Sequence, residues 1–291
     1  MNYIGTKLTD FLNRGYSNLE WTGIKWSLVP LMMIILCYAI PDFRGAIIHE
    51  NICSYIDCSY AIKLPYVGLA IAGGLGLMYL FEVAMLVCLP LLAVVSFYLF
   101  SYLEAVGLKG EYGLFSLTFL SQFIAYVRHK RNPATDLATE RVHFPLQLIA
   151  AAYVLSAISK LWVSGLGWFN ENAVNFAVQI YREYSSSYAS SGQIAFEGLA
   201  RDYSSFILQN VWLIKLLLGF CVLIEACAFI LVTGKRNAFF YAFLLIGLHI
   251  GIYFTMHILL WTIIYPMLAF TINPIYHFME LLKWGKRKAI G

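Results

Sequence analysis

The chain has 291 residues, of which 60% are hydrophobic and only 12% carry a charge, and its mean hydropathy is +0.71. Soluble globular proteins carry roughly a quarter charged residues, and no polar stretch here is long enough to bury a core of its own. The composition therefore excludes an ordinary soluble protein. The formal net charge of +4 is clustered along the chain, so it indicates membrane topology and not a nucleic-acid partner.

The first 25 residues precede the first long apolar run. Ile4, Leu8, Phe11 and Leu12 fall on one helical face, which predicts an amphipathic helix lying in the membrane interface. The first membrane span is expected at about 26–40, and a polar loop follows it.

The next apolar run, 66–103, is nearly uninterrupted and too long for one span at 1.5 Å per residue, so we divide it near Glu82. The run 238–272 is divided into two spans for the same reason. Three further spans are expected, at about 113–127, 144–163 and 209–232. The sequence thus predicts an all-α, polytopic transmembrane bundle of about eight spans, which we take as a single domain over 1–291.

Basic residues gather at the two ends of the chain and in two of the connections between spans. They are Lys7 and Arg14; Arg128, Lys130, Arg131 and Arg141; Lys235 and Arg236; and Lys283, Lys286, Arg287 and Lys288. Cytoplasmic segments of membrane proteins carry an excess of Lys and Arg. Eight spans place all four groups and both termini in the cytoplasm, and a bacterial inner membrane is the expected location.

This orientation puts 41–64 and 164–206 outside the cytoplasm. Cys53 and Cys58 share the first of these loops, where they form either a disulfide or two free thiols. The segment 164–206 starts with Trp168 and Phe169, which suit an aromatic interfacial belt, and it is the surface on which a partner protein would dock.

Ionisable residues inside membrane spans are costly and are therefore candidates for function. Six residues meet this description: Glu82, Lys160, Lys215, Glu225, His249 and His257. A structural role is open to each of them. Glu82 suits a tight turn at the surface, and Lys215 is placed to extend its ammonium to the outer headgroups.

Lys160 either reaches the outer interface in the same way or is desolvated and neutral often enough to act as a base. Glu225 has too short a side chain to reach far, so it is either protonated or paired with a cation on a neighbouring helix. His249 and His257 share a broad helical face at best, as hydrogen-bonded core residues or as a proton relay. No further ligands at compatible spacing are present for zinc, so no metal site is expected.

The stretch FPLQLIAAAYVLSAISKLWVSGLGWFNENAV (144–174) resembles the HTTM domain of vitamin K-dependent gamma-carboxylases and their bacterial relatives. The positions that fall on the family's pattern are Gln147, Tyr153, Ala157, Lys160, Leu161, Gly165 and Trp168. LIEACAF (223–229) and GLHIGIYFTMHILLWTIIYPMLAF (247–270) are similar to two further elements of that family, an acidic residue and a histidine-containing span.

The resemblance implies that Lys160 is a base beside a pocket for a quinone or another isoprenoid lipid. It also implies second-tier polar roles for Glu225, His249 and Glu111, and contacts of the lipid with Tyr153, Trp168 and His257. One departure matters: the carboxylases have an Asn-His pair where this chain has Gly110 and Glu111. The carboxylases also carry a large luminal domain that holds the peptide substrate, so we do not expect glutamate carboxylation here.

Three functions remain open at this level. The first is an enzyme that acts on a lipid-soluble substrate with Lys160. The second is a non-catalytic accessory subunit, for example in peptide-toxin maturation, that binds another membrane or periplasmic protein through 164–206. The third is transport, which ranks last because the sequence shows no inverted repeat.

Overall fold

The structure is a computed structural model that describes residues 9, 11–42, 58–105, 113–169, 171–175, 178, 202, 205–206, 208–256 and 261–290. Of the residues described, 90% are helical and none lies in a strand. The all-α prediction is therefore confirmed.

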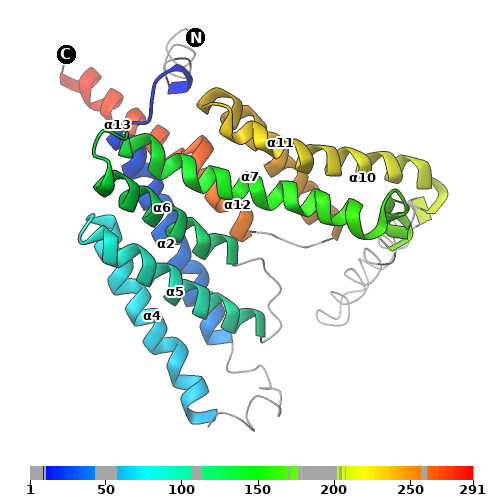
Figure 1. The fold of residues 1–291 in the computed structure, drawn as a ribbon, viewed down its shortest axis with the longest axis horizontal. Helices are drawn as coiled ribbons and strands as arrows, with labels where there is room; N and C mark the ends of the chain where they lie inside the picture. The colour runs from blue at the N-terminus through cyan, green and yellow to red at the C-terminus, as the bar shows by residue number, and fades with distance from the viewer. Residues whose placement is uncertain are drawn as a thin grey trace. The chain divides into compact units, whose positions relative to one another are not determined.

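The helices follow each other in the order that the apolar runs predict (Figure 1). They are α2 (Asn18–Asp42), α4 (Cys58–Leu80), α5 (Met85–Ala105), α6 (Gly113–Arg131), α7 (Leu137–Ser164), α10 (Val211–Ala226), the 3₁₀ segment η2 (Cys227–Val232), α11 (Lys235–Met256), α12 (Trp261–Met267), the π-helical segment η3 (Leu268–Ile272) and α13 (Pro274–Ile290). The long run 66–103 divides where the sequence suggested, because α4 ends at Leu80 and α5 begins at Met85.

Four helical stretches are long and apolar enough to cross a membrane: Asn18–Cys37, Leu137–Ser164, Val211–Val232 and Lys235–Tyr253. A bilayer core of about 30 Å requires about 20 helical residues. Two shorter apolar helices, Pro65–Leu80 and Met85–Ser101, accompany them. The chain is thus an integral membrane protein, while the count of eight spans stays a prediction.

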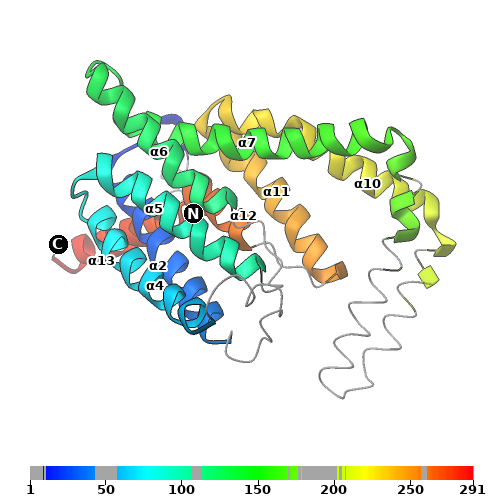
Figure 2. The ribbon, with the colours of Figure 1, turned by 60° about the horizontal axis from the view of Figure 1, so that its bottom comes forward.

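The chain folds as two compact units, Met1–Ile149 with Trp261–Gly291, and Ala150–Leu260. In the first unit α4, α5 and α6 lie side by side, and α2 packs against α4 and α13 (Figures 1 and 2). In the second unit α11 packs against α10 and η2. The helix α7 belongs to both units, since the boundary falls between Ile149 and Ala150. The single domain over 1–291 stays a prediction.

Aromatic rings connect the helices of the first unit. Trp21 of α2 meets Tyr79 of α4 edge to face at 5.8 Å between ring centroids, and Tyr79 meets Phe119 of α6 at 5.5 Å. Phe115 continues the row at 5.7 Å from Phe119 and at 5.7 Å from Phe100 of α5. Such pairs contribute roughly 0.5–1.5 kcal/mol each beyond area burial. The row places α2, α4, α5 and α6 around one core.

The first turns of α2 and α13 approach each other closely at Gly23. A Cβ atom at Gly23 would lie 2.3 Å from Asn273 Oδ1 and 2.8 Å from the backbone nitrogen of Tyr276, so only glycine fits. Asn273 separates η3 from α13 with a φ of +51°, and its Nδ2 donates to the Glu20 carbonyl at 2.7 Å. These contacts fix the direction in which α13 leaves η3.

The predicted lipid-facing side of the N-terminal segment needs one correction. Phe11 is buried, with its ring stacked on Tyr276 at 5.3 Å and edge-on to His277 at 4.8 Å. The reason is that Phe11 packs against two aromatic residues of α13. The helical face of the N-terminal segment does not by itself predict these partners. Ile4 and Leu8 lie outside the described residues.

Asp136 caps the N-terminus of α7. Its Oδ1 accepts the Ala138 N–H at 3.0 Å and its Oδ2 accepts the Thr139 hydroxyl at 2.6 Å. The hydrogen bond from Thr139 lowers the pKa of the Asp136 carboxyl from its ordinary value. The folded protein therefore favours the charged carboxylate at this position.

Replacing Asp136 with Ala is expected to lower the free energy of unfolding by about 1 kcal/mol at neutral pH, the usual effect of losing an N-cap. The pKa in the folded state lies below that of the unfolded chain, so the advantage of the charged carboxylate is complete above the unfolded pKa. It is lost as pH falls through the folded pKa. Thermal unfolding of both proteins in detergent between neutral and acidic pH measures the difference, which should shrink on acidification. Asp136→Asn keeps a neutral cap and serves as the control.

Candidate functional site

Lys160 of α7 and Glu225 of α10 form an ion pair inside the second unit. Lys160 Nζ lies 2.6 Å from Glu225 Oε1 and also contacts Oε2. The Glu225 side chain is 10% exposed and the Lys160 side chain 28% exposed. The sequence left two interpretations of Glu225 open, a protonated side chain or one paired with a cation on a neighbouring helix. The structure shows the pairing.

A second polar pair joins α7 to α11. The Tyr153 hydroxyl lies 2.5 Å from His249 Nε2, and both side chains are buried. His249 Nδ1 is buried as well and has no hydrogen-bond partner among the residues that the structure describes. Tyr153 precedes Lys160 by seven residues, two turns of α7, so the two project from one face. We refer to Tyr153, Lys160, Glu225 and His249 as the Lys160 cluster.

Trp168 covers one side of this cluster. Lys160 Nζ lies 5.6 Å from the centroid of the Trp168 ring, within range of a cation–π interaction. The chain turns at Gly165, whose φ of +54° suits glycine and whose N–H donates to the Leu161 carbonyl at 2.8 Å. This left-handed turn at the end of α7 brings Trp168 back over Lys160.

The side of the cluster that faces away from the protein is apolar. Side chains on α7 and α10 that are exposed and apolar include Leu155, Ile158, Trp162, Trp212, Leu216, Phe220 and Leu223. In a membrane these side chains contact lipid. The cluster thus combines an amine, a carboxylate, a phenol and an imidazole on helices whose outer faces are hydrophobic. Groups of this kind transfer protons when they lie within hydrogen-bond reach of a substrate.

Some predicted site residues are not placed. Glu111, His257 and Cys53 lie outside the described residues, and the side chain of Cys58, the first residue of α4, is not described. Their predicted roles stay predictions. Within the described ranges, no group of three His, Cys, Asp or Glu side chains is arranged to hold a metal ion.

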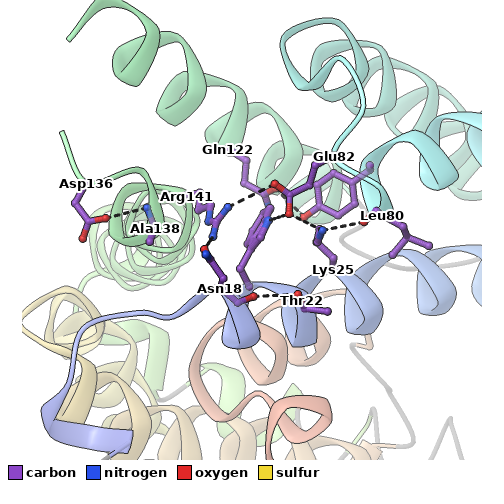
Figure 3. A network of polar contacts seen from close by, with 11 residues as sticks. Asn18, Thr22, Lys25, Leu80, Glu82, Gln122, Asp136, Ala138 and Arg141 are labelled. Carbon is purple, nitrogen blue, oxygen red and sulfur yellow. Dashed lines mark hydrogen bonds and ion pairs between the residues drawn. The ribbon is translucent and has the colours of Figure 1, made fainter. Parts of the chain in front are cut away.

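A second polar network lies in the first unit and is centred on Glu82 (Figure 3). Glu82 Oε1 accepts hydrogen bonds from Lys25 Nζ at 2.7 Å and from Trp21 Nε1 at 3.0 Å. Lys25 Nζ also donates to the Leu80 carbonyl at 2.8 Å, and Arg141 Nη1 lies 3.9 Å from Glu82 Oε2. We refer to Trp21, Lys25, Glu82 and Arg141 as the Glu82 network, which joins the first turns of α2 and α7 to the end of α4.

Two buried cations face one carboxylate in this network. The side chains of Lys25 and Arg141 are 6% and 5% exposed, whereas that of Glu82 is 42% exposed. Arg141 Nη2 donates to Asn18 Oδ1 at 3.1 Å, and its guanidinium carbon lies 4.3 Å from the centroid of the Trp21 ring. Glu82 is therefore a single negative charge beside two positive charges that are largely shielded from water.

The turn that carries Glu82 has an unfavourable backbone. Glu82 and Ala84 have φ angles of +57° and +47°, and neither is a glycine. A left-handed conformation costs a non-glycine residue roughly 1–2 kcal/mol. The surface turn predicted at Glu82 is present, and the contacts of its carboxylate with Lys25 and Trp21 offset this cost.

Sequence reasoning identified Lys160, Glu225, His249, Tyr153 and Trp168, and the structure brings these five together. The Glu82 network is not predicted, because Arg141 belongs to a cluster of basic residues that indicates topology and Lys25 lies just before the first predicted span. One signal was present: Trp21 and Lys25 are four residues apart, on one face at the start of an apolar helix.

Comparisons of the chain with known protein families, with curated proteins and with solved structures gave no match. The Lys160 cluster and the Glu82 network are therefore interpreted through their own geometry.

Proposed function

We propose that this chain is a membrane enzyme that moves a proton to or from a lipid-soluble substrate, with Lys160 as the base. The observation that carries the proposal is the Lys160–Glu225 ion pair beside the Tyr153–His249 hydrogen bond, on helices that are otherwise apolar. Each ionisable group inside a membrane costs free energy. That Glu225 of α10 and His249 of α11 both lie against the face of α7 that carries Lys160 and Tyr153 supports a catalytic role for the cluster.

Each member of the cluster has a distinct part in the proposal. Lys160 Nζ accepts the substrate proton after passing its own to Glu225, whose carboxylate lies within hydrogen-bond distance. Burial limits the net stabilisation that such a pair gives, because desolvation offsets much of the attraction between the charges. Tyr153 orients the His249 ring, and Trp168 limits the positions that the Lys160 ammonium can adopt.

The substrate class rests on the resemblance to the HTTM domain of vitamin K-dependent gamma-carboxylases, which implies a quinone or another isoprenoid lipid. The buried Nδ1 of His249 fits such a headgroup, since it offers one hydrogen bond that no described residue takes. Tyr153 and Trp168 would contact the ring, and His257 and Glu111 keep their proposed secondary roles. A bound quinone would supply redox chemistry that the side chains lack.

We place the enzyme in a bacterial inner membrane with both termini in the cytoplasm. The support for this orientation is the distribution of basic residues, since Arg128, Lys130 and Arg131 end α6 and Arg141 follows in the first turns of α7. Cytoplasmic connections carry such an excess.

The test compares lipid extracts of cells that express the wild type, Lys160→Met or Lys215→Met, by mass spectrometry. A lipid product formed by the wild type should fall about 100-fold or more in Lys160→Met, the usual effect of losing a general base. Lys215→Met is the matched control, because Lys215 lies in α10 but is not a member of the cluster. An unchanged product level in Lys160→Met would remove the catalytic proposal in favour of an accessory subunit.

A further inference from the structure

The C-terminal helix α13 has two faces of different character. On one face Tyr276 is buried against Phe11 and beside Gly23 of α2. On the other face Phe278, Leu281 and Leu282 are exposed by 59%, 60% and 53%. Their spacing of three and four residues places them on one side of the helix. Three large apolar side chains on the same side of α13 would be unfavourable in contact with water.

The helix is not a membrane span. It has 17 residues, about 25 Å at 1.5 Å per residue, which is shorter than the bilayer core. Five charged residues lie in it: Glu280 in its first half, and Lys283, Lys286, Arg287 and Lys288 in its second half. The four basic residues and one acidic residue leave a net charge of +3 (4 − 1), and charges of this number do not enter the hydrocarbon core of a bilayer.

The position of α13 along the chain ties it to the membrane boundary. It begins at Pro274, separated by Asn273 alone from η3, which continues the apolar helix α12. The hydrogen bond from Asn273 to Glu20 and the close approach of Tyr276 to Gly23 hold α13 against α2, so α13 is not free to swing away from the protein. The exposed apolar face of α13 therefore lies close to the point where the apolar segment formed by α12 and η3 ends.

We infer that α13 lies along the membrane surface and binds anionic phospholipid. Phe278, Leu281 and Leu282 insert among the acyl chains, and the positive charge of the sequence that follows attracts the headgroup phosphates. A helix with one apolar face and an excess of Lys and Arg binds a membrane in this way. The positive charge favours this occupant over a second copy of the chain, which would bring two surfaces of the same sign together.

The test uses the full chain reconstituted in vesicles of phosphatidylcholine, with or without phosphatidylglycerol. Trypsin cleaves after Lys283, Lys286, Arg287 and Lys288, and we expect the rate of this cleavage to fall several-fold when phosphatidylglycerol is present. High salt should restore the rate, because it screens the attraction.

Leu281→Glu with Leu282→Glu is the matched variant, since both side chains are exposed and their replacement leaves the contacts of Tyr276 intact. This variant should unfold at the wild-type temperature in detergent and be cleaved equally fast in both kinds of vesicle. Equal cleavage rates of the wild type in the two lipids would overturn the inference. So would protection that depends on the protein-to-lipid ratio, which indicates a second copy. The outcome is independent of Lys160, so it does not bear on the proposed enzyme.

Discussion

Replacing Glu225 with Gln is expected to lower the free energy of unfolding by about 3–5 kcal/mol, because it leaves the Lys160 ammonium without its counter-ion. The carboxylate contacts Lys160 Nζ through both oxygens and is nine-tenths buried, so water does not take its place. Unfolding of the purified protein in mixed micelles measures this difference. A Glu225→Gln protein as stable as the wild type would show that the Lys160–Glu225 ion pair is not formed in the folded protein.

The double variant Lys160→Met with Glu225→Leu separates stability from chemistry. It removes both charges, and replacing a buried ion pair by apolar residues of similar size is often neutral or stabilising. We therefore expect most of the stability lost in Glu225→Gln to return. Activity should not return, because the proposed base is absent. A stable and fully active double variant would assign the pair a purely structural role. Glu280→Gln, which disturbs a surface pair with Lys283 at 3.8 Å, is the control and should change stability by less than about 1 kcal/mol.

The second large effect is expected for Glu82→Gln in the first unit. This change removes the only ion-pair partner of Lys25 and Arg141 among the described residues. We expect a loss of roughly 3 kcal/mol, at the lower end of the range for breaking a buried pair, since Glu82 itself is 42% exposed. Thermal unfolding in detergent should show it as a lower transition temperature, accompanied by altered fluorescence of Trp21, which contacts the same carboxylate oxygen.

A compensating change tests the origin of that loss. Lys25→Met in the Glu82→Gln background removes one of the two buried cations, and stability should partly recover because less charge remains unpaired. Ala84→Gly is a control for the turn, since it relieves a left-handed φ without touching the network, and it should stabilise by about 1 kcal/mol. If Lys25→Met destabilises the Glu82→Gln protein further, the cost lies in lost packing and not in charge.

The helices of this protein are predictable from the sequence because the free energy of placing a residue in the membrane depends mainly on its own side chain. Long apolar runs predict helices, since a backbone in lipid must satisfy its hydrogen bonds within one segment. The same rule divided 66–103 near Glu82, where the structure has the turn between α4 and α5. It also singled out Lys160, Glu225 and His249, because a charged or polar group stands out in an apolar run.

The partners of these groups were decided only by the tertiary structure. Lys160 and Glu225 are 65 residues apart, Tyr153 and His249 are 96 apart, and Lys25 and Glu82 are 57 apart. Periodicity states which face of a helix a side chain occupies, but not which helix lies opposite. That choice depends on the combined packing of many side chains, such as the row of rings from Trp21 to Phe100. The cost of placing a charge in the membrane can thus be recognised residue by residue, whereas the partner that offsets it is determined by the arrangement of the helices.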